Sequence, residues 1–121
     1  MVPILEKEGI VLEDQGLSGS VTFRKFRAPG RIYSYKKSAF VGSLVITRLR
    51  FAAFAFSKPL VNLPLEKDKM DLLELSVPNR NRFLMKFNAG DFHEGWKGTI
   101  ECRFTTEIAD MIMERLNLAG A

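Results

Sequence analysis

The amino-acid sequence predicts a mostly β protein, in which a curled antiparallel sheet of seven strands forms a barrel or sandwich capped by one C-terminal α-helix. Apolar and polar residues alternate along seven segments, and this period of two is typical of strands with one buried face. Most of these segments are joined by short links, which favours an antiparallel meander. Near residue 105 the apolar spacing changes to three and four residues, which indicates a terminal helix.

The first four strands are expected in the N-terminal half of the chain. Residues 18–27 alternate except at the Lys25-Phe26 pair, where we expect a bulge or a bend. The Ala28-Pro29-Gly30 sequence predicts a turn, because Pro fixes φ and Gly tolerates positive φ. The next three strands are expected over residues 35–47, with a kink at Gly42, and over residues 50–56 and 59–65.

The C-terminal half completes the predicted sheet. A charged connection at residues 67–69 precedes strands expected over residues 73–77, 83–87 and 100–104, and a longer hairpin loop spans residues 88–98. In the last segment Thr105 or Thr106 is placed to cap a helix, and Gly120 can end it. The apolar stripe of this helix can close the open end that a two-layered sheet leaves.

The composition fits one domain over residues 1–121, with a compact part at about residues 18–119 and the order of residues 1–8 left open. A hydrophobic fraction of 46% and ten Phe supply a core without disulfides or metals. The single cysteine, Cys102, cannot form an internal bridge, which suits a reducing compartment. No apolar stretch reaches the roughly 18 residues of a membrane-spanning helix, and we expect no secretory signal because the first residues lack a basic segment followed by an apolar one. We therefore expect a cytoplasmic protein, with peripheral membrane attachment left open.

Charge is divided unevenly along the chain. Residues 15–65 contain nine Lys or Arg and no Asp or Glu, whereas the remaining residues contain nine basic and fourteen acidic residues. Such a polarity can steer anionic partners toward one side of the molecule. Folding can also bring the two parts together, so that their charges meet and cancel.

Two short segments carry a family resemblance: residues 42–51, GSLVITRLRF, and residues 61–65, VNLPL. The first resembles the Gly-x-Leu-x-aliphatic-Thr-x-x-Arg-aliphatic pattern of the pleckstrin-homology superfold, in its GRAM-like and bacterial branches. The second resembles the aliphatic-x-aliphatic-Pro-Leu strand that follows it. The resemblance implies a non-catalytic scaffold that binds phosphoinositides, peptides or partner domains near the loop between its first two strands. The basic motif of lipid-binding members is incomplete, because Ser38 stands where a second basic residue is expected after Lys36.

The candidate ligand surface is the basic stretch around the first predicted turn, FRKFRAPGRIYSYKK at residues 23–37. Arg forms bidentate hydrogen bonds with phosphate, and Tyr rings can line a groove or sit at an interface. The stretch is therefore a site for a protein partner or an anionic lipid headgroup, or else a solvated basic hairpin. Nucleic acid is disfavoured, because the rest of the chain is acidic and the strand count exceeds that of oligonucleotide-binding barrels. The predicted ligand-binding residues are Arg24, Lys25, Arg27, Arg31, Tyr33, Tyr35, Lys36 and Lys37.

The segment FAAFAF, residues 51–56, is apolar on both faces of its predicted strand. Such a strand is buried on both sides, so the face away from the core needs a cover. The terminal helix, the N-terminal segment or a second copy of the chain could supply it. The third possibility makes Phe51, Phe54 and Phe56 the candidate interface of a homodimer.

The sequence offers little that would support catalysis. Asp91, His93 and Glu94 fall in one loop but lack the spacing of a metal motif, and Trp96 beside them is a local staple or a contact residue. Cys102 alternates with core residues and is expected to be a small core hydrophobe. We expect no enzymatic activity, no metal and no cofactor. The predicted function is a protein-binding or self-associating module, with binding of anionic lipid headgroups as the alternative.

Overall fold

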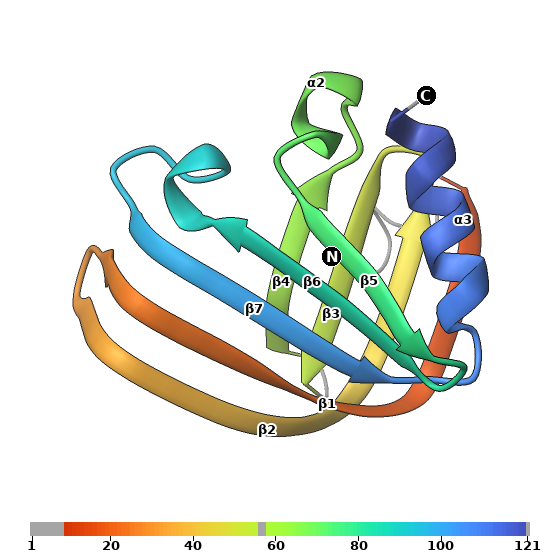
Figure 1. The fold of residues 1–121 in the computed structure, drawn as a ribbon, viewed down its shortest axis with the longest axis horizontal. Helices are drawn as coiled ribbons and strands as arrows, with labels where there is room; N and C mark the ends of the chain where they lie inside the picture. The colour runs from red at the N-terminus through yellow and green to blue at the C-terminus, as the bar shows by residue number, and fades with distance from the viewer. Residues whose placement is uncertain (1–8, 56–57, 121) are drawn as a thin grey trace.

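The computed structural model describes residues 9–55 and 58–120, and these form the predicted class of fold, a mostly β structure with a C-terminal helix (Figure 1). The order of residues 1–8, which the sequence left open, lies outside the described residues. The strands are β1 (Ile10–Ala28), β2 (Arg31–Thr47), β3 (Arg50–Ala55), β4 (Lys58–Pro64), β5 (Glu74–Asn79), β6 (Arg82–Asn88) and β7 (Lys97–Thr105). The helical segments are α2 (Lys67–Met70), the 3-10 helix η1 (Ala89–Asp91) and α3 (Ala109–Gly120).

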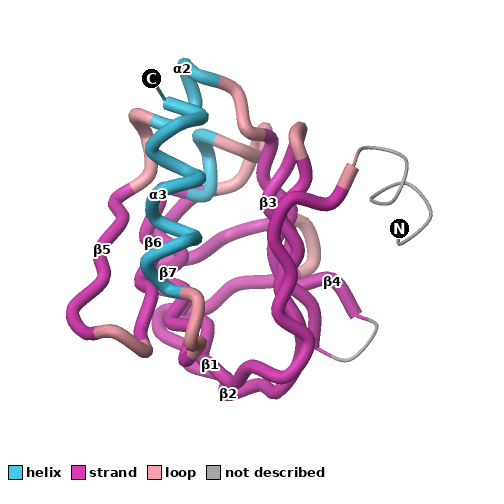
Figure 2. The backbone as a smooth tube through the Cα atoms, turned by 90° about the vertical axis from the view of Figure 1, so that its right-hand side faces the viewer, coloured by secondary structure: helices cyan, strands magenta, loops and turns pink. Residues whose placement is uncertain are grey.

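All seven described strands belong to one antiparallel sheet with the order β4-β3-β2-β1-β7-β6-β5. The sheet is not closed, because β4 and β5 are edge strands that do not pair with each other. The long strands β1 and β2 bend strongly, so that the sheet curls and β3 and β4 come to lie across from β5 and β6 (Figures 1 and 2). The architecture is therefore an open curled sheet rather than a complete barrel.

Helix α3 packs on the inner side of this curl, where it contacts α2, β5 and β6 (Figure 2). Its buried residues Ala109, Ile112 and Leu116 lie three and four positions apart and join the main hydrophobic core. The Thr106 hydroxyl accepts a hydrogen bond from the Ile108 N–H at 3.3 Å, which provides the predicted cap at the start of the helix. The predicted amphipathic helix and its role as a cover for the core are thus confirmed.

Phenylalanine rings dominate the centre of the core. Phe51, Phe83 and Phe104 are each at most 1% exposed. Their ring centroids lie 5.9 to 6.4 Å apart, within the range of favourable aromatic pairs. Burying each ring contributes roughly 1.5 to 3 kcal/mol. Since the three come from β3, β6 and β7, they join the two layers of the curled sheet.

Strands β1 and β2 differ most from the predicted starts, and both begin earlier than the sequence predicted. β1 starts at Ile10, because a register shift within residues 14–17 disrupts the alternation that would have revealed its first part. β2 starts at Arg31, because Ala28 already pairs with Arg31 and the turn requires only Pro29-Gly30. The longer strands matter for function because β2 extends well beyond residues 42–46, the part of it that pairs with β3.

The bulge predicted in β1 is present and changes which residues face the core. Lys25 has a φ of 51°, and the pairing of β1 with β7 shifts register between Arg24 and Arg27. Gly98 on β7 permits this geometry, because a Cβ atom there would lie 2.4 Å from the Lys25 carbonyl oxygen. Core-facing residues are odd-numbered before the bulge and even-numbered after it, as the buried Val21 and Phe26 show.

The two connections expected to be irregular each contain a short helix. Residues 67–69 belong to α2, and the loop at residues 88–98 contains η1. Lys69 Nζ donates a hydrogen bond of 2.7 Å to the Asp91 carbonyl oxygen and so ties α2 to η1. This bond helps to place the loop that carries His93 and Trp96.

Candidate functional site

A cluster of aromatic and basic side chains lies at the end of the sheet away from α3, where the β1–β2 turn approaches the loop between η1 and β7 (Figure 1). The Phe26 ring holds its centre, with centroids 4.8 Å from Phe23, 5.9 Å from Tyr33 and 5.6 Å from Trp96. Contacts between rings therefore join the hairpin to the loop. We call this cluster the mouth, and it comprises Phe23, Phe26, Arg31, Tyr33, Lys36, His93 and Trp96.

Two cations of the mouth lie over aromatic rings. Arg31 Cζ is 5.4 Å from the Trp96 centroid and 5.8 Å from the Phe26 centroid. Lys36 Nζ is 4.6 Å from the Tyr33 centroid. Each such contact is worth about 0.5 to 1 kcal/mol at an exposed site. The rings thus position positive charge at the edge of an apolar surface.

A cavity of about 220 Å³ opens between the mouth and strand β4. Most of its lining is apolar, and polar groups enter it from Arg31, Asn62 and His93. A cavity with an apolar lining and few polar groups is typical of ligand-binding pockets, although this one is small. The complete lining is Phe23, Arg31, Leu60, Val61, Asn62, Leu63, Phe87, His93, Trp96 and Ile100.

The His93 imidazole stacks on the Trp96 indole with a centroid distance of 4.0 Å. Partial burial lowers the pKa of His93 below its ordinary value of 6.5, and the nearby Arg31 charge lowers this pKa further. The imidazole is therefore neutral at pH 7. Arg31 supplies the positive charge on this side of the cavity.

The eight residues predicted as one ligand surface are divided between the two faces of the sheet. Neighbouring residues of a strand point to opposite faces, and residues paired across strands share a face. Lys36 pairs with Phe23 of the mouth, whereas Lys37 pairs with Thr22 on the other face. Arg31, Tyr33 and Lys36 belong to the mouth, Lys25 occupies the bulge, and the opposite face carries Arg24, Arg27, Tyr35 and Lys37.

The opposite face, which we call the outer face, is strongly basic across β2, β1, β7 and β6. Strand pairing brings cations of the basic N-terminal half beside cations of β6 and β7, so charge accumulates here instead of cancelling. The acidic residues on the described part of this face are Glu13, Glu74 and Glu101. Its basic residues are Arg24, Arg27, Lys37, Arg82, Lys86, Lys97 and Arg103.

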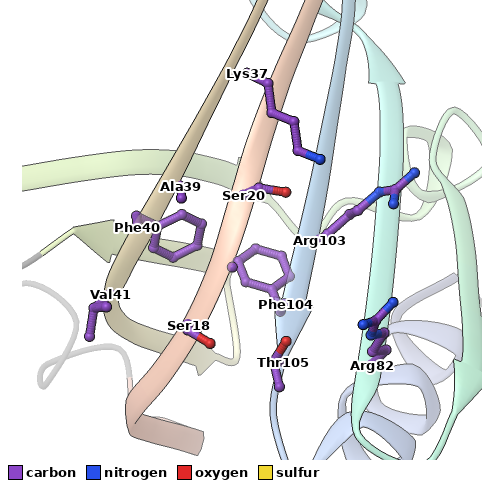
Figure 3. A pocket seen from close by; sticks show the side chains of 11 residues that line it. Ser18, Ser20, Lys37, Ala39, Phe40, Val41, Arg82, Arg103, Phe104 and Thr105 are labelled. Carbon is purple, nitrogen blue, oxygen red and sulfur yellow. The ribbon is translucent and has the colours of Figure 1, made fainter.

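A shallow groove of about 660 Å³ lies on the outer face, and Figure 3 shows its lining. Lys37, Arg82 and Arg103 stand around it, while Ser18 and Ser20 form part of its floor. The other lining residues are Gly19, Ala39, Phe40, Val41, Phe104 and Thr105. Small side chains on β1 and β2 leave this space between the longer basic side chains.

Of the groove's polar residues, only Lys37 was predicted from the sequence to bind a ligand, whereas Thr105 was named only as a possible helix cap. Arg103 alternates with the buried Cys102 and Phe104, so its outward direction could have been predicted from the period of two. Its position beside Ser20 depends on the pairing of β1 with β7, which no local pattern specifies. The groove could therefore be predicted only with knowledge of the strand order in the sheet.

The described residues of the predicted homodimer interface, Phe51 and Phe54, are buried within the chain and not exposed on its surface. Phe51 lies in the main core, and Phe54 is 5% exposed in a second buried cluster with Val45 and Ala52. Phe56 lies outside the described residues. Both faces of β3 are thus covered within one chain, and α3 does not provide the second cover because it packs with α2, β5 and β6.

The buried cysteine is not set up as a nucleophile. Burial, together with a smaller effect of the Glu101 charge, raises the pKa of the Cys102 thiol from 9.0 to about 12. A protonated thiol is a poor nucleophile, and the residue packs in the core between Ile100 and Phe104. Among the described residues, no group of three or more His, Cys, Asp or Glu side chains is arranged to hold a metal ion.

None of the described helices has the length and apolar character needed to cross a membrane. Two surfaces of the described residues combine charged and apolar groups around a hollow: the mouth, with its small cavity, and the outer face, with its groove. Comparison with known proteins gives no family assignment: no protein-family model matches the chain, and no match was found among curated proteins.

Proposed function

We propose that this chain is a non-catalytic interaction module that binds a protein partner at the mouth. The observation that carries the proposal is the cavity of about 220 Å³, where Arg31, His93 and Trp96 border an apolar lining. Trp, Tyr and Arg supply most of the binding energy at protein interfaces when they border a desolvated pocket. A pleckstrin-homology-like fold, which the sequence resemblance suggests, is in keeping with this role.

The chemistry of the mouth suits a peptide segment that combines an apolar side chain with a neighbouring carboxylate. The apolar side chain would enter the cavity and be removed from water against Leu63, Phe87 and Ile100. The carboxylate would accept hydrogen bonds from Arg31, whose charge the Trp96 and Phe26 rings hold at the rim. We also propose that the protein acts in the cytoplasm, which its single, buried cysteine supports.

Selection from a random peptide library displayed on phage tests this function. We expect enriched peptides to share an apolar or aromatic residue next to Asp or Glu. Trp96→Ala and Arg31→Gln should each weaken a selected peptide by about tenfold or more. Lys37→Gln, on the outer face, is the matched control and should bind normally. Selected peptides that bind all four proteins equally would contradict a site at the mouth.

Binding to anionic lipid headgroups is a second candidate, favoured by apolar side chains on the outer face. Ile32, Tyr35 and Val41 are 71%, 59% and 60% exposed, and they follow β2 beside the basic residues. Such residues can enter a membrane interface while the cations attract anionic lipids. Flotation with phosphatidylserine vesicles should recover the protein at low salt and release it at high salt. Protein that stays unbound to these vesicles at low salt excludes attachment driven by surface charge alone.

Self-association through β3 has weaker support than either binding function. Phe51 and Phe54 are covered within a single chain, so they offer little apolar area to a second copy. Light scattering at increasing protein concentration tests this point. We expect the mass of the monomer, 13.7 kDa, throughout the range. A mass that doubles in wild type but not in Phe54→Glu, with that variant still folded, would restore the interface at β3.

A further inference from the structure

We infer that the groove on the outer face is a second binding site, separate from the mouth, that takes a phosphate group of its ligand. Lys37 on β2, Arg82 on β6 and Arg103 on β7 supply positive charge. Ser18 and Ser20 on β1 and Thr105 on β7 supply hydroxyl groups between them. This inference does not depend on the function proposed for the mouth.

Strand register explains why these groups converge. Ser18, Thr105 and Arg82 form one row across β1, β7 and β6, while Ser20 and Arg103 pair in the next row. Directly opposite residues have Cβ atoms about 5 Å apart. Lys37 comes from the adjoining row, where it pairs with Thr22, and its side chain extends toward Arg103 (Figure 3). Three cations thus surround a patch of hydroxyl groups on a rigid sheet.

The nearest carboxylate leaves most of this donor capacity available. Glu101 Oε1 accepts a hydrogen bond from Arg103 Nε at 2.8 Å. A guanidinium has five N–H donors, and this ion pair involves only the one on Nε. The pair also directs the Arg103 side chain along the sheet. Glu101 therefore positions a phosphate-binding residue without neutralising the three-cation group.

The number of donors favours phosphate over a carboxylate as the bound group. A single carboxylate is satisfied by one guanidinium fork, whereas a phosphate monoester carries up to two negative charges and three terminal oxygens. Two guanidiniums, one ammonium and three hydroxyls match that larger demand. The hollow also has room, because Ser18, Ser20 and Ala39 are small. The remaining apolar wall, from Phe40 and Val41, would contact the carbon portion of the ligand.

Titration with inorganic phosphate and with glycerol 3-phosphate, followed by ¹⁵N-resolved NMR, tests the site. We expect the largest shifts at the amides of Ser20, Arg103 and Thr105. Lys37→Gln and the double variant Arg82→Gln/Arg103→Gln should each weaken binding by about tenfold or more. Lys36→Gln is the matched control, because it removes a neighbouring charge from the other face, and it should bind as wild type does.

Vesicles identify where the phosphate comes from. Phosphatidic acid carries a phosphate monoester, whereas phosphatidylserine carries a diester, so the two lipids are compared at equal surface charge. Binding of soluble monoesters alone indicates a soluble ligand, and preference for phosphatidic acid indicates a lipid headgroup; either result supports the site. Failure to bind both the soluble monoesters and the phosphatidic acid vesicles would overturn the inference. Binding that is unchanged in the groove variants, with those variants still folded, would also overturn it. Trp96→Ala should leave phosphate binding intact, so failure at the mouth and failure at the groove are distinguishable.

Discussion

The rings of Phe40 and Phe104 meet edge to face across Gly19, with centroids 5.9 Å apart. Gly19 pairs with Phe40 on one side and with Phe104 on the other, so the three residues share one face of the sheet. A Cβ atom at Gly19 would lie 2.2 Å from the Arg103 carbonyl oxygen and 2.9 Å from Phe40 Cζ. The missing side chain is what lets the two rings approach over β1.

Gly19→Ala should therefore destabilise the protein. The new methyl group would press against backbone as well as a ring, and such overpacking costs about 1 to 3 kcal/mol. Gly16→Ala is the matched control in the same strand, because a Cβ there meets nothing within 4 Å. Urea denaturation measures the free energy of unfolding of both variants. Equal stabilities for the two variants would contradict this account of Gly19.

The Thr106 hydroxyl joins the start of α3 to the irregular part of β1. It donates a hydrogen bond of 2.5 Å to Asp14 Oδ2 and accepts one from the Ile108 N–H. Thr106→Val keeps the shape but removes both bonds, and loss of a helix cap costs about 0.5 to 2 kcal/mol. Thr106→Ser should retain most of the stability because it keeps the hydroxyl. Thermal unfolding of both variants checks this, and a valine variant as stable as the serine variant would refute it.

The Cys102 thiol should make stability fall at high pH. Its pKa is about 12 in the folded protein but near 9.0 when exposed, so the unfolded chain loses the proton first as the pH rises. Stability from the neutral thiol is complete below pH 9 and declines toward pH 12. Between pH 7 and pH 10 wild type should lose roughly 1 kcal/mol more than Cys102→Ala, because pH 10 lies about one unit above the pKa of the unfolded thiol. Parallel losses in the two proteins would contradict this.

His93 should titrate below its ordinary range in the folded protein. Because its pKa is lowered, the unfolded chain takes up the proton first as the pH falls, so the stability from the neutral imidazole is present above pH 6.5 and lost below it. An NMR titration of the imidazole should give a midpoint below 6.5. Arg31→Gln should move the midpoint upward by removing a positive charge. Lys37→Gln, on the other face, should change it less, and a midpoint unaffected by Arg31→Gln would contradict the charge effect.

The sequence was sufficient to predict the strands whose alternation is uninterrupted. Phe83, Met85 and Phe87 on β6 pair with Phe104, Cys102 and Ile100 on β7, and all six are buried as their period of two predicts. The start of β1 could not be predicted, because its register shift near residues 14–17 breaks the period. Propensity and spacing describe a strand, but they do not report irregularities that tertiary pairing imposes.

The candidate sites were less predictable than the fold. The basic hairpin at residues 23–37 was recognised by composition, but its charges fall on two faces because neighbouring residues such as Lys36 and Lys37 point to opposite sides of β2. The groove combines β1 and β2 with β6 and β7, and only the strand order brings Arg82 and Arg103 beside Ser18 and Ser20. A local pattern gives the direction of each side chain, whereas the partners across the sheet depend on the whole fold.

Attaching a nitroxide label at position 36 or at position 37 tests most directly the claim that neighbouring cations serve two separate surfaces. Lys36→Cys and Lys37→Cys can each be labelled selectively, because the only native cysteine is buried. We predict that the label at 36 broadens the Trp96 indole N–H resonance more strongly, and that the label at 37 broadens the Arg103 Nε–H resonance more strongly. If both labels broaden the same resonance to the same extent, the two surfaces are one and the account is wrong.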